Sequence, residues 1–105
     1  MGTAVYISDI SQAKLDYAFK FGVDGTILSR SDEAMRQKTA DITGSDGFVV
    51  TIEAVGLPST FQQAIDAAAY AGRVVLIGIS KQRLDFDFTV IQRKELNVYG
   101  VAQRV

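Results

Sequence analysis

Cysteine and histidine are both absent from the 105 residues of this sequence. Without cysteine there are no disulfides and no thiolate nucleophiles, and without histidine there are no imidazole bases. The two absences also remove the ligand types that zinc and iron sites usually need. Any metal would have to be bound by oxygen atoms alone, so we expect no zinc site in this chain.

An excess of either charge is also missing, because eleven Lys and Arg residues are balanced by twelve Asp and Glu residues, for a formal net charge of −1. We therefore expect no nucleic acid and no membrane as a partner, since both favour a strongly basic surface. The sequence has no basic-then-apolar leader and no apolar run of membrane-spanning length, from which we expect a cytoplasmic location. It also lacks repeats and linkers, so residues 1–105 are interpreted as a single domain.

The sequence does contain an alternation of apolar, strand-like runs with segments of helical periodicity. The expected strands are residues 4–7, 26–28, 48–52, 73–79 and 96–101. The expected helices are residues 11–21, residues 32–43, a helix from Pro58 that Gly72 ends, and one or two turns within 89–94. Strands that alternate with helices imply a parallel sheet with right-handed crossovers, so the predicted fold class is α/β.

Two of the expected strands are near-continuous apolar runs, FVVTI (Phe48–Ile52) and RVVLIGI (Arg73–Ile79). Such runs are typical of strands covered on both faces, and we expect the first to be central in the sheet. The alternating segment LDFDF (Leu84–Phe88) fits either an edge strand or an extended loop. Its two acids, Asp85 and Asp87, are interpreted as a solvated face.

Function in parallel α/β sheets gathers at the carboxyl ends of the strands, where the first expected strand is followed by Asp9. A carboxylate there can accept hydrogen bonds from both hydroxyls of an adenosine ribose, and its charge would repel a 2′-phosphate. It can equally cap the following helix, as Ser11 also can. Lys14, one turn into that helix, could lie beside the same ribose or be a solvated surface lysine. Both interpretations stay open for each residue.

Two glycines follow later strands and also have two interpretations. Gly56, at the end of EAVG (Glu53–Gly56), could let a ligand approach the backbone or serve the turn before Pro58. Gly78 could open main-chain groups to a flat ring or relieve packing. Glu53 is an acid at a strand tip, but no second catalytic group fixed beside it marks it as a general base. We therefore assign no catalytic residue.

A glycine-rich phosphate loop is missing, because neither GxGxxG nor GxxxxGK[ST] occurs. The glycine-containing segment DITGSDG (Asp41–Gly47) lies between an expected helix and a strand. That is the reverse of the order in which a helix N-terminus could receive phosphate, so it is interpreted as a connection.

Taken in order, three segments resemble the nucleotide-binding domain of the medium-chain, zinc-type alcohol and polyol dehydrogenases, closest to the sorbitol, threonine and sugar-acid branch. They are VYISDISQAKLDYAFKFGVDGTI, FVVTIEAVGLPSTFQQAIDAAAYAGRVVLIGIS and FTVIQRKELNVYG, and the match runs from about Val5 to Gln103. The resemblance implies a family of NAD(P)-dependent oxidoreductases with NAD as the cofactor. It also implies that the family's first strand, glycine-rich turn and catalytic domain would lie before Met1.

The resemblance further implies which residues contact the cofactor. Asp9 matches the ribose-binding acid, which favours NAD over NADP, and Lys14 matches a lysine on the adenosine side. The floor of the adenosine cleft is matched by Val55 and Gly56. The strands that meet the nicotinamide amide are matched by Ile77, Gly78, Ile79, Val101 and Gln103.

A fold prediction follows from the missing strand. The family sheet has the strand order 3-2-1-4-5-6, and without strand 1 the renumbered order is 2-1-3-4-5. We therefore expect a Rossmann-derived three-layer sandwich with a five-stranded parallel sheet, in which residues 4–7 pair directly with residues 48–52. One sheet face is expected to be under-covered and apolar. A homodimer should then form through the edge strand Leu96–Val101, through that face, or by exchange of a terminal strand.

Two functions compete on these grounds. The first is the nucleotide-binding portion of a zinc-type dehydrogenase, inactive alone and with weak or absent NAD binding. The second is a flavodoxin-like homodimeric binding or interaction module without enzymatic activity. A receiver-like or flavin-binding domain is disfavoured, because the first strand ends in a single acid and no hydroxyl-rich phosphate loop follows it.

Overall fold

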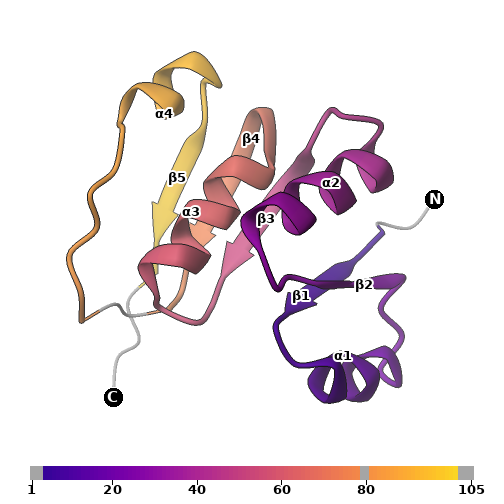
Figure 1. The fold of residues 1–105 in the computed structure, drawn as a ribbon. Coiled ribbons are helices and arrows are strands. Elements are labelled where there is room, and N and C mark those ends of the chain that lie inside the picture. Colours follow the sequence, from indigo (N-terminus) through magenta and orange to yellow (C-terminus); the bar gives the residue numbers. More distant parts are fainter. Residues whose placement is uncertain (1–3, 79–80, 102–105) are drawn as a thin grey trace. The chain divides into compact units, whose positions relative to one another are not determined.

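The computed structural model describes residues 4–78 and 81–101 (Figure 1). The chain divides into two compact units, residues 1–38 and residues 39–105. In both units, parallel strands alternate with helices, which confirms the predicted α/β class. None of the helices in the described ranges has the length and apolar content needed to span a bilayer. The interpretation of residues 1–105 as one domain stays a prediction.

The first unit is a two-stranded parallel sheet with a connecting helix. Its elements are β1 (Tyr6–Asp9), α1 (Gln12–Phe19) and β2 (Gly25–Leu28). Leu15 of α1 and Ile27 of β2 are buried, because α1 lies against both strands. Phe19, which has the spacing of the apolar face, is instead 58% exposed. A positive φ of 89° at Gly22 lets the chain turn after this helix.

Helix α2 (Asp32–Thr43) spans the boundary between the units and has the bounds that the sequence predicts. It is followed by Gly44, whose φ of 61° is the left-handed conformation expected after a helix. The second unit then contains β3 (Phe48–Glu53), α3 (Pro58–Ala67), β4 (Ala68–Leu76), α4 (Thr89–Arg93) and β5 (Asn97–Gly100). Its three strands are parallel in the order β3-β4-β5. Residues 83–87 form an extended connection, which resolves the ambiguity of the alternating segment.

The core of the second unit lies between α3 and one face of its sheet. Ile65 of α3 and Val74 of β4 are fully buried there, and Leu96 lies beside them just before β5. Phe86 of the extended connection and Ile91 of α4 pack against the same cluster. Both helices therefore cover the same face (Figure 1).

Helix α3 ends at Ala67, five residues before the glycine that the sequence predicts as its stop. Ala68 is already extended, with ψ at 141°, and it pairs with Phe48 before the register shifts. Alanine favours helix, so the alanine-rich run predicts a longer helix than the tertiary pairing allows. The chain then bends at Ala71, whose φ is 60°.

The strand pairs β1-β2, β3-β4 and β4-β5 all occur in the predicted order, and the pairing of residues 4–7 with residues 48–52 stays a prediction. The strand orders 2-1 and 3-4-5 are thus observed, but the link that would join them into one sheet is not. Within the three-stranded order β3-β4-β5 the strand β3 is terminal, and its expected central position in a five-stranded sheet stays a prediction. An apolar run indicates a strand suited to being covered, but it does not show that this chain supplies the cover.

The face of the β3-β4-β5 sheet opposite α3 is open and apolar. Ile52, Val75 and Tyr99 form a row across the three strands on that face, because they are register partners and lie one position from the row that contains Val74. Ile52 is 62% exposed and Tyr99 is 50% exposed. The expectation of an under-covered apolar face is therefore met in this unit.

Candidate functional site

The carboxyl ends of β3 and β4 meet at a buried carboxylate. Glu53, the last residue of β3, is only 4% exposed. Its Oε1 atom accepts hydrogen bonds from the backbone N–H groups of Val55 and Gly56, both at 2.7 Å, and from the hydroxyl of Thr60 at 2.8 Å. Thr60 lies in the first turn of α3, so Glu53 holds the turn between strand and helix in place.

The two glycines of this site are in direct backbone contact. A Cβ atom on Gly78 would overlap the backbone nitrogen of Gly56 and would lie 2.8 Å from Oε2 of Glu53. Gly56 itself is buried and has a φ of 87°, which favours glycine. Of the two interpretations open for each glycine, the geometry supports packing for Gly78 and turn formation for Gly56.

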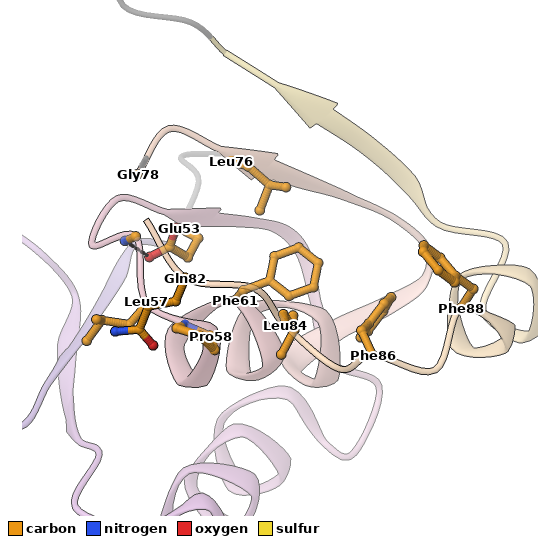
Figure 2. Close-up of a pocket in the computed structure, with 11 residues that line it drawn as sticks. Glu53, Leu57, Pro58, Phe61, Leu76, Gly78, Gln82, Leu84, Phe86 and Phe88 are labelled. Atoms are coloured by element: carbon orange, nitrogen blue, oxygen red, sulfur yellow. Dashed lines mark hydrogen bonds between the residues drawn. The ribbon is translucent and has the colours of Figure 1, made fainter. Parts of the chain in front are cut away.

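A pocket of about 310 Å³ opens beside this turn (Figure 2). Its walls come from the start of α3, the end of β4 and the extended connection before α4. The lining residues are Glu53, Gly56, Leu57, Pro58, Phe61, Leu76, Gly78, Gln82, Leu84, Phe86 and Phe88. Phe86 makes edge-to-face contacts with Phe61 and Phe88, at centroid distances of 5.1 and 5.6 Å. Sequence reasoning missed this pocket, although the alternating Leu84–Phe88 segment signalled that one face of the connection would be covered.

The chemistry available in this pocket is limited. Among the lining residues that the structure describes, Glu53 is the single acidic one and none is basic. Because Oε1 of Glu53 already accepts three hydrogen bonds, this carboxylate is arranged to organise a turn and not to move a proton.

Asp87 lies at the far end of the same connection, just before α4, and its side chain accepts hydrogen bonds from the first residue of that helix. Its Oδ1 atom accepts hydrogen bonds from the hydroxyl of Thr89 at 2.7 Å and from the backbone N–H of Thr89 at 3.0 Å. The hydroxyl bond is the main reason that the pKa of Asp87 lies below its usual value of 3.8, with the backbone bond and Arg93 contributing in the same direction. The solvated position expected for this acid is confirmed, since its side chain is 69% exposed.

Asp9 and Lys14, the two candidates of the first unit, lie around the start of α1. Oδ1 of Asp9 accepts a hydrogen bond from the N–H of Ser11 at 2.8 Å, and the hydroxyl of Ser11 accepts one from the N–H of Lys14 at 3.3 Å. Both side chains named as possible caps therefore take part in the turn, while Lys14 is exposed. A carboxylate can accept about four hydrogen bonds, so the one bond from Ser11 leaves Asp9 with acceptor capacity.

The remaining candidates lie in the second unit, at the ends of its strands. The backbone N–H groups of Ile77 and Gly78 both donate to the carbonyl of Glu53, at 2.8 and 3.0 Å. The N–H of Val101 donates to the carbonyl of Leu76 at 2.9 Å. These residues, together with Gly56 and the exposed Val55, therefore lie at the carboxyl ends of the strands in the β3-β4-β5 sheet. Two further candidates, Ile79 and Gln103, lie outside the described residues.

The donor atoms of this chain do not fit the zinc sites of the family that the sequence resembles. The sequence supplies no thiolate and no imidazole. Within residues 4–78 and 81–101, no group of three or more acidic side chains is placed to share a metal ion.

Parallel strands connected by helices, with candidate residues at the carboxyl ends of the strands, are the arrangement of α/β folds that bind ligands at those ends. The family model described as zinc-binding dehydrogenase matches residues 1–104. This chain therefore belongs to the zinc-binding dehydrogenase family.

Individual relatives extend well beyond this chain. An L-threonine 3-dehydrogenase of Saccharopolyspora erythraea is 30% identical over 100 residues, which cover 95% of this chain and 29% of that protein. A zinc-dependent alcohol dehydrogenase of Streptococcus pneumonia is 26% identical with a TM-score of 0.87, over 94% of this chain and 29% of that one. A protein of Sinorhizobium meliloti, assigned as a zinc-binding dehydrogenase and solved bound to NADP, is 25% identical with a TM-score of 0.74, over 94% and 30% of the two chains. The chain thus spans about 29% of the length of the curated relatives it matches.

Proposed function

We propose that this chain is the part of an NAD-binding domain that faces the adenosine and nicotinamide of the cofactor, and that it is catalytically inactive alone. The whole enzyme would be a zinc-type, NAD-dependent alcohol, polyol or sugar-acid dehydrogenase. The proposal depends most on one observation: the family match covers residues 1–104 but only 29% of a full-length relative. Inactivity is supported by the lack of cysteine and histidine, because the chain has neither zinc ligands of the usual kinds nor an imidazole for proton transfer.

NAD is the proposed cofactor because of Asp9. This carboxylate ends β1 and keeps acceptor capacity for ribose hydroxyls, while its charge would repel the 2′-phosphate of NADP. At the other end of the cofactor, backbone groups around Ile77, Gly78 and Val101 would meet the nicotinamide amide. The sequence contains no glycine-rich loop that could bind the diphosphate of NAD, so the binding of NAD should be weak or absent.

An NMR titration tests the assignment of Asp9. At millimolar concentrations, NAD should shift the amide signals of Asp9 to Lys14, whereas NADP should shift them less. The variant Asp9→Asn should lose this preference, and Asp16→Asn, at an exposed acid of α1, should keep it. Equal responses to NAD and NADP in the unmodified chain would contradict the assignment.

An activity assay tests the second part of the proposal. The chain with NAD, added zinc and a panel of polyols, L-threonine and sugar acids should produce no NADH, as measured by the absorbance of the reduced nicotinamide. Turnover that a chelator abolishes would contradict the proposed inactivity.

We also propose that a second copy of the chain pairs along β5. This strand is an edge of the β3-β4-β5 order, and its Tyr99 is an exposed member of the apolar row on the open face. Sedimentation should detect a dimer that Tyr99→Lys weakens, whereas Tyr70→Lys, at an exposed tyrosine outside this row, should leave it intact. A stable dimer without any response to NAD would favour the alternative, a homodimeric interaction module. A cytoplasmic location stays a prediction from the sequence.

A further inference from the structure

The C-terminus of α3 is capped by a lysine that lies 26 to 29 residues further along the chain. The last carbonyls of a helix lack partners within the helix, and α3 has no basic residue in its own last turn. Instead, Nζ of Lys94 donates to the carbonyl oxygens of Ile65 at 3.3 Å, Asp66 at 3.0 Å and Ala68 at 3.0 Å. Lys94 follows α4 directly, so the cap comes from a different helix-to-strand connection.

The geometry suits an ammonium group. A lysine has three N–H donors on one atom, and here three carbonyl oxygens converge on that atom. The neighbouring carbonyl of Ala64 is bonded by the Thr51 hydroxyl at 2.9 Å, so it does not compete for Lys94. The positive charge also lies at the negative end of the helix dipole. Burial lowers the pKa of Lys94, and the Asp66 carboxylate partly opposes that shift.

The backbone of Lys94 joins the same elements. Its N–H donates to the carbonyl of Val90 at 3.0 Å, which ends α4, and its carbonyl accepts from the N–H of Ala71 at 2.7 Å. Ala71 has a φ of 60° in the bend between α3 and the rest of β4. The next residue, Glu95, has a φ of 50°, after which Leu96 enters the core and β5 begins.

We propose that Lys94 is a clasp, whose ammonium fastens the turn between α4 and β5 to the C-terminus of α3 and thereby fixes where β5 begins. Because Lys94 contacts both segments, the bend at Ala71 and the strand β5 unfold locally and refold together. It lies in the second unit alone and does not depend on NAD binding or on the proposed dehydrogenase function.

Amide hydrogen exchange on the full chain tests the clasp. In Lys94→Met, which keeps the apolar stem and removes the donors, exchange at Ala71 and at Val98 to Gly100 should rise about tenfold or more, as expected for the loss of hydrogen bonds to a charged group. The control Lys20→Met, at an exposed lysine of the first unit, should leave these amides unchanged. Unchanged exchange at these amides in a folded Lys94→Met chain would overturn the proposal.

Chemical rescue separates the clasp from a general loss of packing. In Lys94→Ala, n-propylammonium should restore protection at the same amides, whereas tetramethylammonium, which has the charge but no N–H donors, should not. Equal effects of the two cations would overturn the proposal.

If the variants do not fold, the unmodified chain gives the answer. The ammonium protons of Lys94, observed by NMR at low temperature, should exchange with water more slowly than those of Lys20. Exchange as fast as that of Lys20 would mean that the three carbonyls are not held, and the proposal would fail.

Discussion

Gly78 cannot carry a side chain without overlapping the backbone nitrogen of Gly56. The two glycines belong to different strand ends, the first after β4 and the second in the turn between β3 and α3. Their contact places backbone against backbone, with the Glu53 carboxylate beside both. The carboxyl ends of these strands, where the cofactor is proposed to bind, therefore depend on close packing between the backbones of Gly78 and Gly56.

Gly78→Ala should destabilise the chain by about 1–3 kcal/mol, because the new methyl group meets backbone atoms that cannot move aside easily. Urea unfolding followed by circular dichroism measures this change. Gly100→Ala is the matched control, because a Cβ there meets no atom within 4 Å. A Gly78→Ala chain as stable as this control would show that the strand ends are not in contact.

Glu53→Gln should lower the free energy of unfolding by about 1–2 kcal/mol, because three hydrogen bonds to a charged oxygen become bonds to a neutral one. The exposed acid Asp85 provides the control substitution, Asp85→Asn, with a change of at most about 0.5 kcal/mol. If both substitutions had the same small effect, Glu53 would not be the organiser of the turn.

The hydrogen bonds from Thr89 to Asp87 should make the stability of the folded chain depend on pH. Because the pKa of Asp87 is lower in the folded chain than its usual 3.8, ionised Asp87 stabilises the folded state fully at pH values above 3.8. This stabilisation is lost as the pH falls through the lowered pKa. A carboxyl NMR titration of Thr89→Val should show the pKa of Asp87 rising toward its usual value, because the hydroxyl is the main cause of the shift. If the pKa of Asp87 were the same in Thr89→Val as in the unmodified chain, a group other than the Thr89 hydroxyl would be the main cause of the lowered pKa.

Local patterns predicted the individual elements well. The bounds of α2 follow from signals close together in the chain, namely the helical spacing of Met35, Thr39 and Ile42 and the glycine after the helix, Gly44. The end of α3 was predicted too late, because the decisive contact is made by Phe48, twenty positions away in the chain.

Relationships between distant segments were predicted less well. The apolar run of β3 predicted a strand, but the run does not identify the neighbouring strands, and the expected central position of β3 stays a prediction. The role of Glu53 was also missed, since three donors from the following turn and helix become visible only in three dimensions. The cofactor-binding residues implied by the family resemblance stay predictions.

The most direct test of the central claim is a calorimetric titration of the full chain with NAD. The account predicts no measurable heat at micromolar concentrations, because the diphosphate of the dinucleotide has no glycine-rich loop to bind it. Saturable binding with micromolar affinity would contradict it and would show that this chain binds the cofactor without that loop.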